Sequence, residues 1–155
     1  MAKDIMSEHY CKPVPDLPIV PDSLILDLKA IEENQHLCAV ANEDMYRSYS
    51  ANADLRDYLA EFHPYPIVVR YQVINRPLPV HVDSHKADHP WKLNYIIHTG
   101  GDVRTQFWSS ENEPHELIEE HTLEKNKWYK LNINQPHSIT PPITTRISIT
   151  VKRKT

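Results

Sequence analysis

The residues best suited to chemistry are two histidines and an aspartate, His81, Asp83 and His137. On an extended strand the side chains of residues i and i+2 leave the same face, so His81 and Asp83 point together. A third ligand from another strand completes one face of an octahedron and leaves the opposite positions open. Two imidazoles and one carboxylate with open positions suit non-haem iron(II). The three residues are therefore the candidate metal ligands and the candidate catalytic centre.

Arg146 and Ser148 follow His137 and carry the second part of the pattern. In residues 144–152 apolar side chains such as Ile147 and Ile149 alternate with polar ones. Polar strand faces commonly meet water, but an arginine turned into a barrel needs an anion to offset its burial. The guanidinium binds a carboxylate through two parallel hydrogen bonds, and Ser148 can donate another from the same face. The short distance in sequence between His137 and Arg146 favours the inward direction. We therefore expect Arg146 to face the interior and to bind a carboxylate.

The joint pattern His81-x-Asp83, His137 and Arg146-x-Ser148 resembles the iron(II)/2-oxoglutarate-dependent dioxygenase superfamily. The resemblance implies that the two histidines and the aspartate hold iron(II). It also implies that Arg146 and Ser148 bind the distal carboxylate of the cosubstrate 2-oxoglutarate. Because the carboxylate ligand is present, hydroxylation with O2, releasing succinate and CO2, is the expected reaction rather than halogenation.

The region from Trp128, with Asn132, Asn134 and Pro136-His137-Ser138, resembles the small prolyl-hydroxylase-like and aspartyl/asparaginyl-hydroxylase-like members. Tyr71 lies where prolyl-hydroxylase-like members place a tyrosine that contacts the cosubstrate, and Tyr95 resembles a second. Asn94 is the alternative to Tyr95 for this contact with the cosubstrate, because a shift of one residue in the strand register exchanges the two faces of the strand. Ordinary core packing with a satisfied hydroxyl is the alternative for both tyrosines. The aspartyl-hydroxylase branch commonly lacks the carboxylate ligand, so Asp83 departs from it.

Other histidines near Asp83 are rival ligands. His85 continues the same-face alternation, and His85 and His89 could pair across one helical turn. Three successive same-face strand positions spread over ~13 Å, which favours a ligand from another strand. The loop 84–91 is expected to form the rim of the site.

The elements that must position these residues are mostly strands. Period-two patterns indicate strands at 67–74, 78–82, 92–98, 103–109, 116–122, 128–133, 137–140 and 144–152. The adjacent Gly100 and Gly101 indicate a tight turn between two of them. The fold class is therefore mainly β, a jelly-roll or cupin-like barrel, which matches the double-stranded β-helix that the resemblance implies.

The chain before residue 65 has a different pattern. Residues 1–22 are proline-rich and predict an extended arm, while residues 23–34 and 53–62 have the apolar stripes of helices. We expect residues 23–64 to form a helical layer on the outer sheet and residues 65–152 to form the barrel. The length of 155 residues favours a single domain over 1–155.

Composition narrows the function classes. A net charge of -4 gives no reason to expect nucleic acid as an obligate partner, and no apolar run reaches the ~20 residues of a membrane helix. We expect a cytoplasmic protein with a small-molecule, amino-acid or peptide substrate, and the oligomeric state stays open. The alternatives are a cupin-like barrel that binds a metal or ligand without oxygenase activity, and an interaction module that has lost its chemistry. The Arg146-x-Ser148 pair and the intact metal ligands favour the oxygenase.

Overall fold

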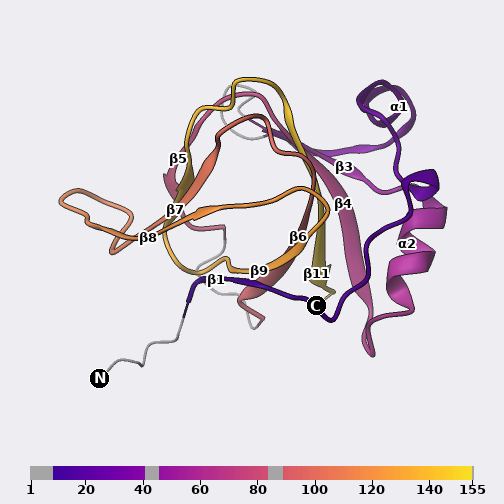
Figure 1. The fold of residues 1–155 in the computed structure, drawn as a ribbon, viewed down its shortest axis with the longest axis horizontal. Coiled ribbons are helices and arrows are strands. Elements are labelled where there is room, and N and C mark those ends of the chain that lie inside the picture. Colours follow the sequence, from indigo (N-terminus) through magenta and orange to yellow (C-terminus); the bar gives the residue numbers. More distant parts are fainter. Residues whose placement is uncertain (1–8, 41–45, 84–88, 155) are drawn as a thin grey trace.

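Two antiparallel sheets face each other as a jelly roll in the computed structural model, which describes residues 9–40, 46–83 and 89–154 (Figure 1). The larger sheet has seven strands in the order β1-β9-β6-β11-β4-β3-β2. The smaller sheet has four strands in the order β5-β10-β7-β8. The predicted mainly β, jelly-roll fold class is confirmed.

The strand bounds agree closely with the strands predicted after residue 65. The larger sheet contains β1 (Cys11–Pro13), β2 (Leu37–Val40), β3 (Tyr46–Ser50), β4 (Ile67–Ile74), β6 (Trp91–His98), β9 (Trp128–Asn132) and β11 (Arg146–Arg153). The smaller sheet contains β5 (Leu78–His81), β7 (Arg104–Trp108), β8 (Leu117–Thr122) and β10 (His137–Ile139).

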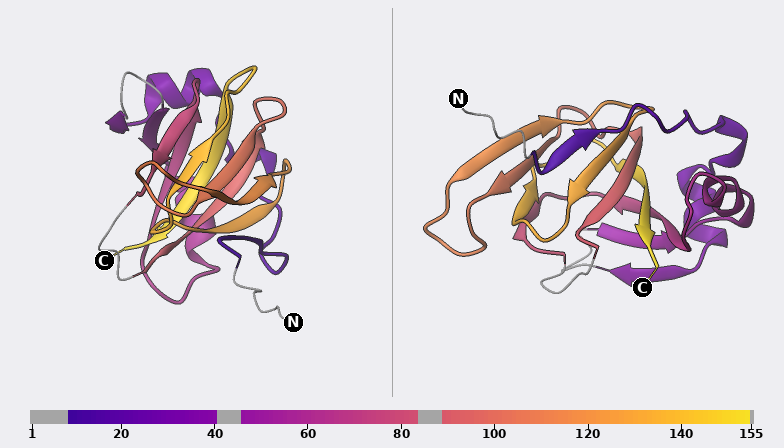
Figure 2. Two further views of the ribbon diagram at one scale, coloured as in Figure 1. Left: turned by 90° about the vertical axis from the view of Figure 1, so that its left-hand side faces the viewer. Right: turned by 90° about the horizontal axis from the view of Figure 1, so that it is seen from below.

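The helices α1 (Leu28–Asn34) and α2 (Ala53–Ala60) lie outside the larger sheet (Figure 2). Their buried residues Ile31, Leu55 and Leu59 belong to one apolar cluster with the outward row of β4 and β11, including Ile149. Each such side chain contributes roughly 1.5–3 kcal/mol by burial. Neither helix, nor any other in the described part of the chain, is long and apolar enough to cross a membrane.

The expected helical layer over 23–64 is interrupted in two places. Residues Asp22–Leu24 form a short 3-10 helix, and α1 begins only after Asp27, whose Oδ1 accepts a hydrogen bond from the Ala30 amide at 2.8 Å. Between the helices, β2 and β3 extend the larger sheet, with Ser48 of β3 opposite Gln72 of β4. The prediction of a purely helical layer was wrong because tertiary pairing with β4 recruits this segment into the sheet.

The N-terminal arm is pinned to both sheets. Cys11 of β1 pairs with Leu131 of β9, at the edge of the larger sheet. The ring of Tyr10 stacks on Phe107 of β7 with a centroid distance of 5.7 Å. Cys11 is buried, and this burial, with the nearby Glu119 carboxylate, raises the pKa of its thiol to about 12. The arm therefore closes one side of the jelly roll.

The predicted glycine turn packs against the start of β11. Gly100 and Gly101 connect β6 to β7 with φ of +82° and +106°. A Cβ at Gly100 would lie 3.1 Å from the Cβ of Arg146, so only glycine allows this approach without a shift. Ile143, which precedes β11, is 80% exposed, and its amide donates to the Gly100 carbonyl.

Candidate metal centre

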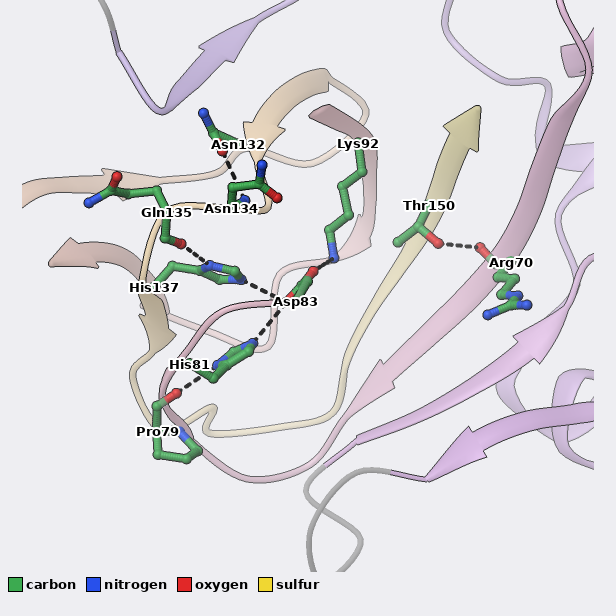
Figure 3. A network of polar contacts seen from close by, with 10 residues as sticks. All are labelled: Arg70, Pro79, His81, Asp83, Lys92, Asn132, Asn134, Gln135, His137 and Thr150. Carbon is green, nitrogen blue, oxygen red and sulfur yellow. Dashed lines mark hydrogen bonds and ion pairs between the residues drawn. The ribbon is translucent and has the colours of Figure 1, made fainter. Parts of the chain in front are cut away.

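His81, Asp83 and His137 converge at the end of the smaller sheet (Figure 3). Pairing of β5 with β10 sets His81 opposite His137, and their ring centroids are 4.4 Å apart. Asp83 follows β5, and its amide donates to the Ile133 carbonyl at 3.1 Å. One ligand atom from each of the three residues lies within 4.8 Å of the other two. The structure thus brings together the three residues that the sequence singled out.

Backbone carbonyls fix which nitrogen each histidine presents. Nδ1 of His81 lies 2.7 Å from the Pro79 carbonyl oxygen, and Nδ1 of His137 lies 2.7 Å from that of Gln135. A carbonyl oxygen only accepts hydrogen bonds, so Nδ1 carries the hydrogen in both rings. In the neutral ring Nε2 then holds the free lone pair, which is the arrangement of a metal-ligating histidine.

Both Nε2 atoms face the same carboxylate oxygen. Asp83 Oδ1 lies 3.0 Å from Nε2 of His81 and 3.1 Å from Nε2 of His137. A carboxylate oxygen and a lone-pair nitrogen are both acceptors, so a cation must lie between them. That cation is either a proton on each ring or one metal ion bound by all three atoms. The donor set of two nitrogens and one oxygen fits a divalent transition metal.

The pKa shifts in the cluster indicate which of its groups are charged. Burial raises the pKa of Asp83, but the Lys92 ammonium and the hydrogen bonds from His137 and His81 outweigh it, so the pKa lies well below its usual range. Burial lowers the pKa of His81, but the hydrogen bonds to Asp83 and to the Pro79 carbonyl, together with the charge of Asp83, outweigh burial and raise this pKa. Asp83 is therefore ionised at neutral pH and available as an anionic ligand.

Lys92 is a functional residue that sequence reasoning missed. Its Nζ lies 3.2 Å from Asp83 Oδ2, the oxygen that does not face the histidines, and its side chain is only 11% exposed. The available signal was alternation along β6, where Lys92 and Asn94 share a face. The sequence could not show which carboxylate the ammonium meets, because Lys92 and Asp83 are joined through a loop of unknown path.

Replacing Lys92 by methionine is expected to lower the free energy of unfolding of the metal-free protein by about 1–2 kcal/mol. The substitution keeps the apolar stem but leaves a largely buried carboxylate without its ammonium partner. Urea unfolding measures the change, and Lys154→Met at an exposed position is the matched control, expected within about 0.5 kcal/mol of the parent. Equal stability of the two variants would show that the ion pair contributes nothing.

Arg146 faces the interior, beside the cluster. It is 2% exposed and lines a cavity of about 20 Å³ together with His81, Asp83, His137 and Asn94. Its Nη1 and the Oδ1 of Asn94 are buried without a hydrogen-bond partner among the described residues. Burial lowers the pKa of Arg146 to about 10, which keeps it charged at neutral pH. A buried, incompletely paired guanidinium is costly, so its position favours an anionic ligand.

Ser148 lies on the same inward row as Arg146 and is 1% exposed. Its main-chain partners are Gln72 on β4 and Ile96 on β6. It is not among the residues that line the cavity of Arg146. The structure therefore places Ser148 on the expected face but not in the wall of this cavity.

Tyr71 and Tyr95 lie on the opposite face of the larger sheet from the cluster. The Tyr71 hydroxyl donates to Asn52 Oδ1 at 2.6 Å and accepts from the Leu26 amide at 3.0 Å. The Tyr95 hydroxyl accepts from the Val20 amide at 3.2 Å. The expectation that these tyrosines contact a cosubstrate was wrong, because strand alternation turns them toward the helices. Asn94 takes the inward position instead.

A second, wider cavity also adjoins the cluster. It has a volume of about 310 Å³, and its walls include His81, Asp83 and Lys92 together with Arg70 and Lys152. The rival ligand His85 and most of the expected rim loop lie at 84–88, outside the described residues.

Comparisons with known proteins identify the fold. No protein-family model matches the sequence, and no curated protein matches it. Among solved structures, a prolyl-4-hydroxylase from Pseudomonas putida is similar with a TM-score of 0.59 and 14% identity, over 98% of this chain and 97% of that one. Vicilin from Corylus avellana (hazelnut) has a TM-score of 0.50 and 13% identity over 77% of this chain, which spans only 31% of the vicilin chain.

A 2OG-Fe(II) oxygenase family oxidoreductase from Burkholderia pseudomallei has a TM-score of 0.47 and 7% identity, over 80% of this chain and 74% of that one. At these identities, the likeness to the prolyl-4-hydroxylase and to vicilin shows a shared jelly-roll fold. The prolyl-4-hydroxylase likeness also extends over nearly the whole of both chains.

Proposed function

We propose that this chain is an iron(II)- and 2-oxoglutarate-dependent oxygenase that hydroxylates a small-molecule, amino-acid or peptide substrate and releases succinate and CO2. One observation carries the proposal. A cluster of two nitrogens and one oxygen, arranged as metal ligands, shares a cavity with a buried arginine whose Nη1 has no partner among the described residues. The similarity of this chain's fold to that of a prolyl-4-hydroxylase supports the proposal.

The metal ligands in this proposal are Nε2 of His81, Nε2 of His137 and Oδ1 of Asp83. Bound iron(II) supplies the oxidising chemistry together with 2-oxoglutarate and O2. The Pro79 and Gln135 carbonyls hold the two rings in the ligating tautomer. Because Lys92 binds Oδ2, it leaves Oδ1 as the ligating oxygen of the carboxylate.

Arg146 binds the distal carboxylate of 2-oxoglutarate in this proposal. The fork geometry of the guanidinium matches a carboxylate, and Nη1 is available for it. The buried Asn94 side chain lies in the same wall and can donate a hydrogen bond. Since about 20 Å³ holds only a water-sized molecule, binding of the diacid requires the cavity walls to move apart.

The function is tested by adding iron(II) and 2-oxoglutarate without oxygen, then admitting O2. We expect a weak visible metal-to-ligand absorption band from the ternary complex, followed by one succinate for each 2-oxoglutarate consumed. Asp83→Ala is the control and should give neither. Metal binding without the band and without succinate would contradict the proposal. It would favour the cupin-like binding barrel, which the small cavity beside Arg146 also fits.

A further inference from the structure

The wider cavity has the size and position of a binding site for a second molecule. It lies between β5, which contributes Leu78, and the inner face of β3, β4 and β11, and it has a volume of about 310 Å³. This volume is at the lower end of the range for small-molecule sites. Because His81 and Asp83 belong to its wall, a molecule in this cavity lies beside the metal cluster.

The cavity wall carries an excess of positive charge. Arg70, Lys92 and Lys152 line it, and Asp83 is the one carboxylate among the described residues of its wall. Lys92 already binds that carboxylate at 3.2 Å. Within the described ranges, neither Arg70 nor Lys152 has a side-chain ion pair. Burial, followed by repulsion from Lys92, lowers the pKa of Lys152, while Asp83 opposes this shift. Arg70 and Lys152 therefore have no anionic side-chain partner among the residues that the structure describes.

Strand pairing holds these cations together. In the register of β11, Thr150 lies opposite Arg70 on β4 and opposite Asn94 on β6. The Thr150 hydroxyl donates to the Arg70 carbonyl oxygen at 3.5 Å (Figure 3). Like charges on adjacent strands are unfavourable unless something neutralises them. Arg70 and Lys152 thus lie on paired strands of the sheet rather than on a loop.

The rest of the wall can bind a polar molecule. Ser48, Gln72 and Tyr46 contribute hydroxyl and amide groups, and Leu78 and Val82 contribute apolar surface. In the part of the chain that the structure describes, the side chains of Tyr46 and Gln72 make no hydrogen bond. A molecule with one anionic group and a mixed polar and apolar remainder matches this wall.

This charge is separate from the carboxylate site at Arg146. Arg146 does not line the wider cavity, and neither Arg70 nor Lys152 lines the small one. Arg146 and Lys152 stand near opposite ends of β11, roughly 20 Å apart at the usual rise of a strand. The metal ligands His81 and Asp83 line both cavities, so an anion in either cavity lies beside them.

We infer that the wider cavity binds the anionic group of a small carboxylate or phosphate compound through Arg70 and Lys152, and that this compound is the substrate. The identification as substrate rests on the proposed oxygenase function, whereas the anion binding does not. The substrate class is then a small acid, held at its charged end with the remainder directed toward the cluster.

The test is an NMR titration of the full, metal-free chain, because an anion would otherwise bind to the metal. An Arg146→Gln background removes the deeper anion site. Propionate and inorganic phosphate are the two anionic probes, and propionamide is the uncharged one. We expect both Arg70→Gln and Lys152→Gln to weaken binding of the preferred anion at least tenfold, since each removes a charge-assisted contact.

Lys154→Gln is the matched control outside the cavity and should leave the affinity unchanged, and Arg70→Lys should recover much of the loss. A stronger response to propionate or to phosphate identifies the anionic group. Equal affinity in the Arg70→Gln, Lys152→Gln and Lys154→Gln variants, or equal binding of propionamide, would overturn the inference. Anion binding that depends on Arg70 in a protein that forms no succinate would support the anion site but reject the oxygenase function and, with it, the identification of the compound as substrate. Succinate formation without anion binding that depends on Arg70 would support the oxygenase function and reject the anion site.

Discussion

His137→Ala is expected to weaken iron(II) binding by more than about 100-fold. His137 presents Nε2 directly to the cluster, at 3.1 Å from Asp83 Oδ1. Loss of a partner that only orients a ligand typically costs 10–100-fold in metal affinity, so loss of the ligand itself should cost more. An anaerobic titration against a competing chelator measures the affinity. Because bound metal stabilises the folded state, thermal unfolding with and without iron(II) gives an independent measurement.

The matched control for this experiment is His98→Ala. His98 is at the end of β6 with an exposed side chain, and it makes no part of the cluster. The His98→Ala variant should bind iron(II) with the same affinity as the parent protein. An unchanged affinity in His137→Ala would mean that the cluster is an ion pair between protonated histidines and Asp83, and the metal centre would have to be abandoned.

Arg146→Met is expected to have two effects of opposite sign. It should abolish binding of 2-oxoglutarate, because Lys92, the other cation in the wall of the small cavity, is already paired with Asp83. It should also raise the free energy of unfolding of the unliganded protein by about 1–4 kcal/mol, the range seen when well-packed apolar side chains replace buried charges. The basis is a side chain only 2% exposed, with Nη1 unpaired among the described residues.

A loss of 2-oxoglutarate affinity together with a gain in the free energy of unfolding would show that Arg146 has a binding role rather than a structural one. Calorimetry with 2-oxoglutarate and a metal under anaerobic conditions measures the first effect, and urea unfolding measures the second. Arg146→Lys keeps the charge without the fork and should retain weak binding of the diacid. If Arg146→Met were instead less stable than the parent and bound 2-oxoglutarate normally, Arg146 would be a structural residue.

Strand alternation was sufficient to separate the two faces of β11, whereas the inward direction of its polar face and the approach of His81 to His137 were predicted from the joint motif. Alternation along 144–152 placed Arg146 and Ile147 on opposite faces of the strand, because the direction of successive side chains depends only on local strand geometry. The same rule applied to Tyr71, which alternates with Val69 and Val73, already pointed to the apolar side. The family resemblance favoured the opposite assignment for this residue, and the strand geometry was the better guide.

Other features depended on contacts that a single sequence does not encode locally. Lys92 acquires its role from Asp83, and the loop between them had no predictable path. Residues 46–50 joined the sheet because β4 offered a partner edge, and this pairing overrode the helical expectation for the surrounding segment. The tautomers of His81 and His137 depend on two carbonyl groups whose direction is set only in the folded chain.

The pinned N-terminal arm has a mechanical consequence for ligand entry. β1 and Tyr10 join the two sheets along one seam, whereas β5 and β3 face each other across the wider cavity along the other. His81 and His137 belong to the smaller sheet, while Arg70, Arg146 and Lys152 belong to the larger. We therefore expect any separation of the sheets to be larger at the wider cavity than along the seam that the arm holds, and to require loss of the ion pair between Lys92 and Asp83. Such a separation changes the distance between the metal ligands and the anion-binding cations, so the geometry of the reactants depends on how fully the barrel closes.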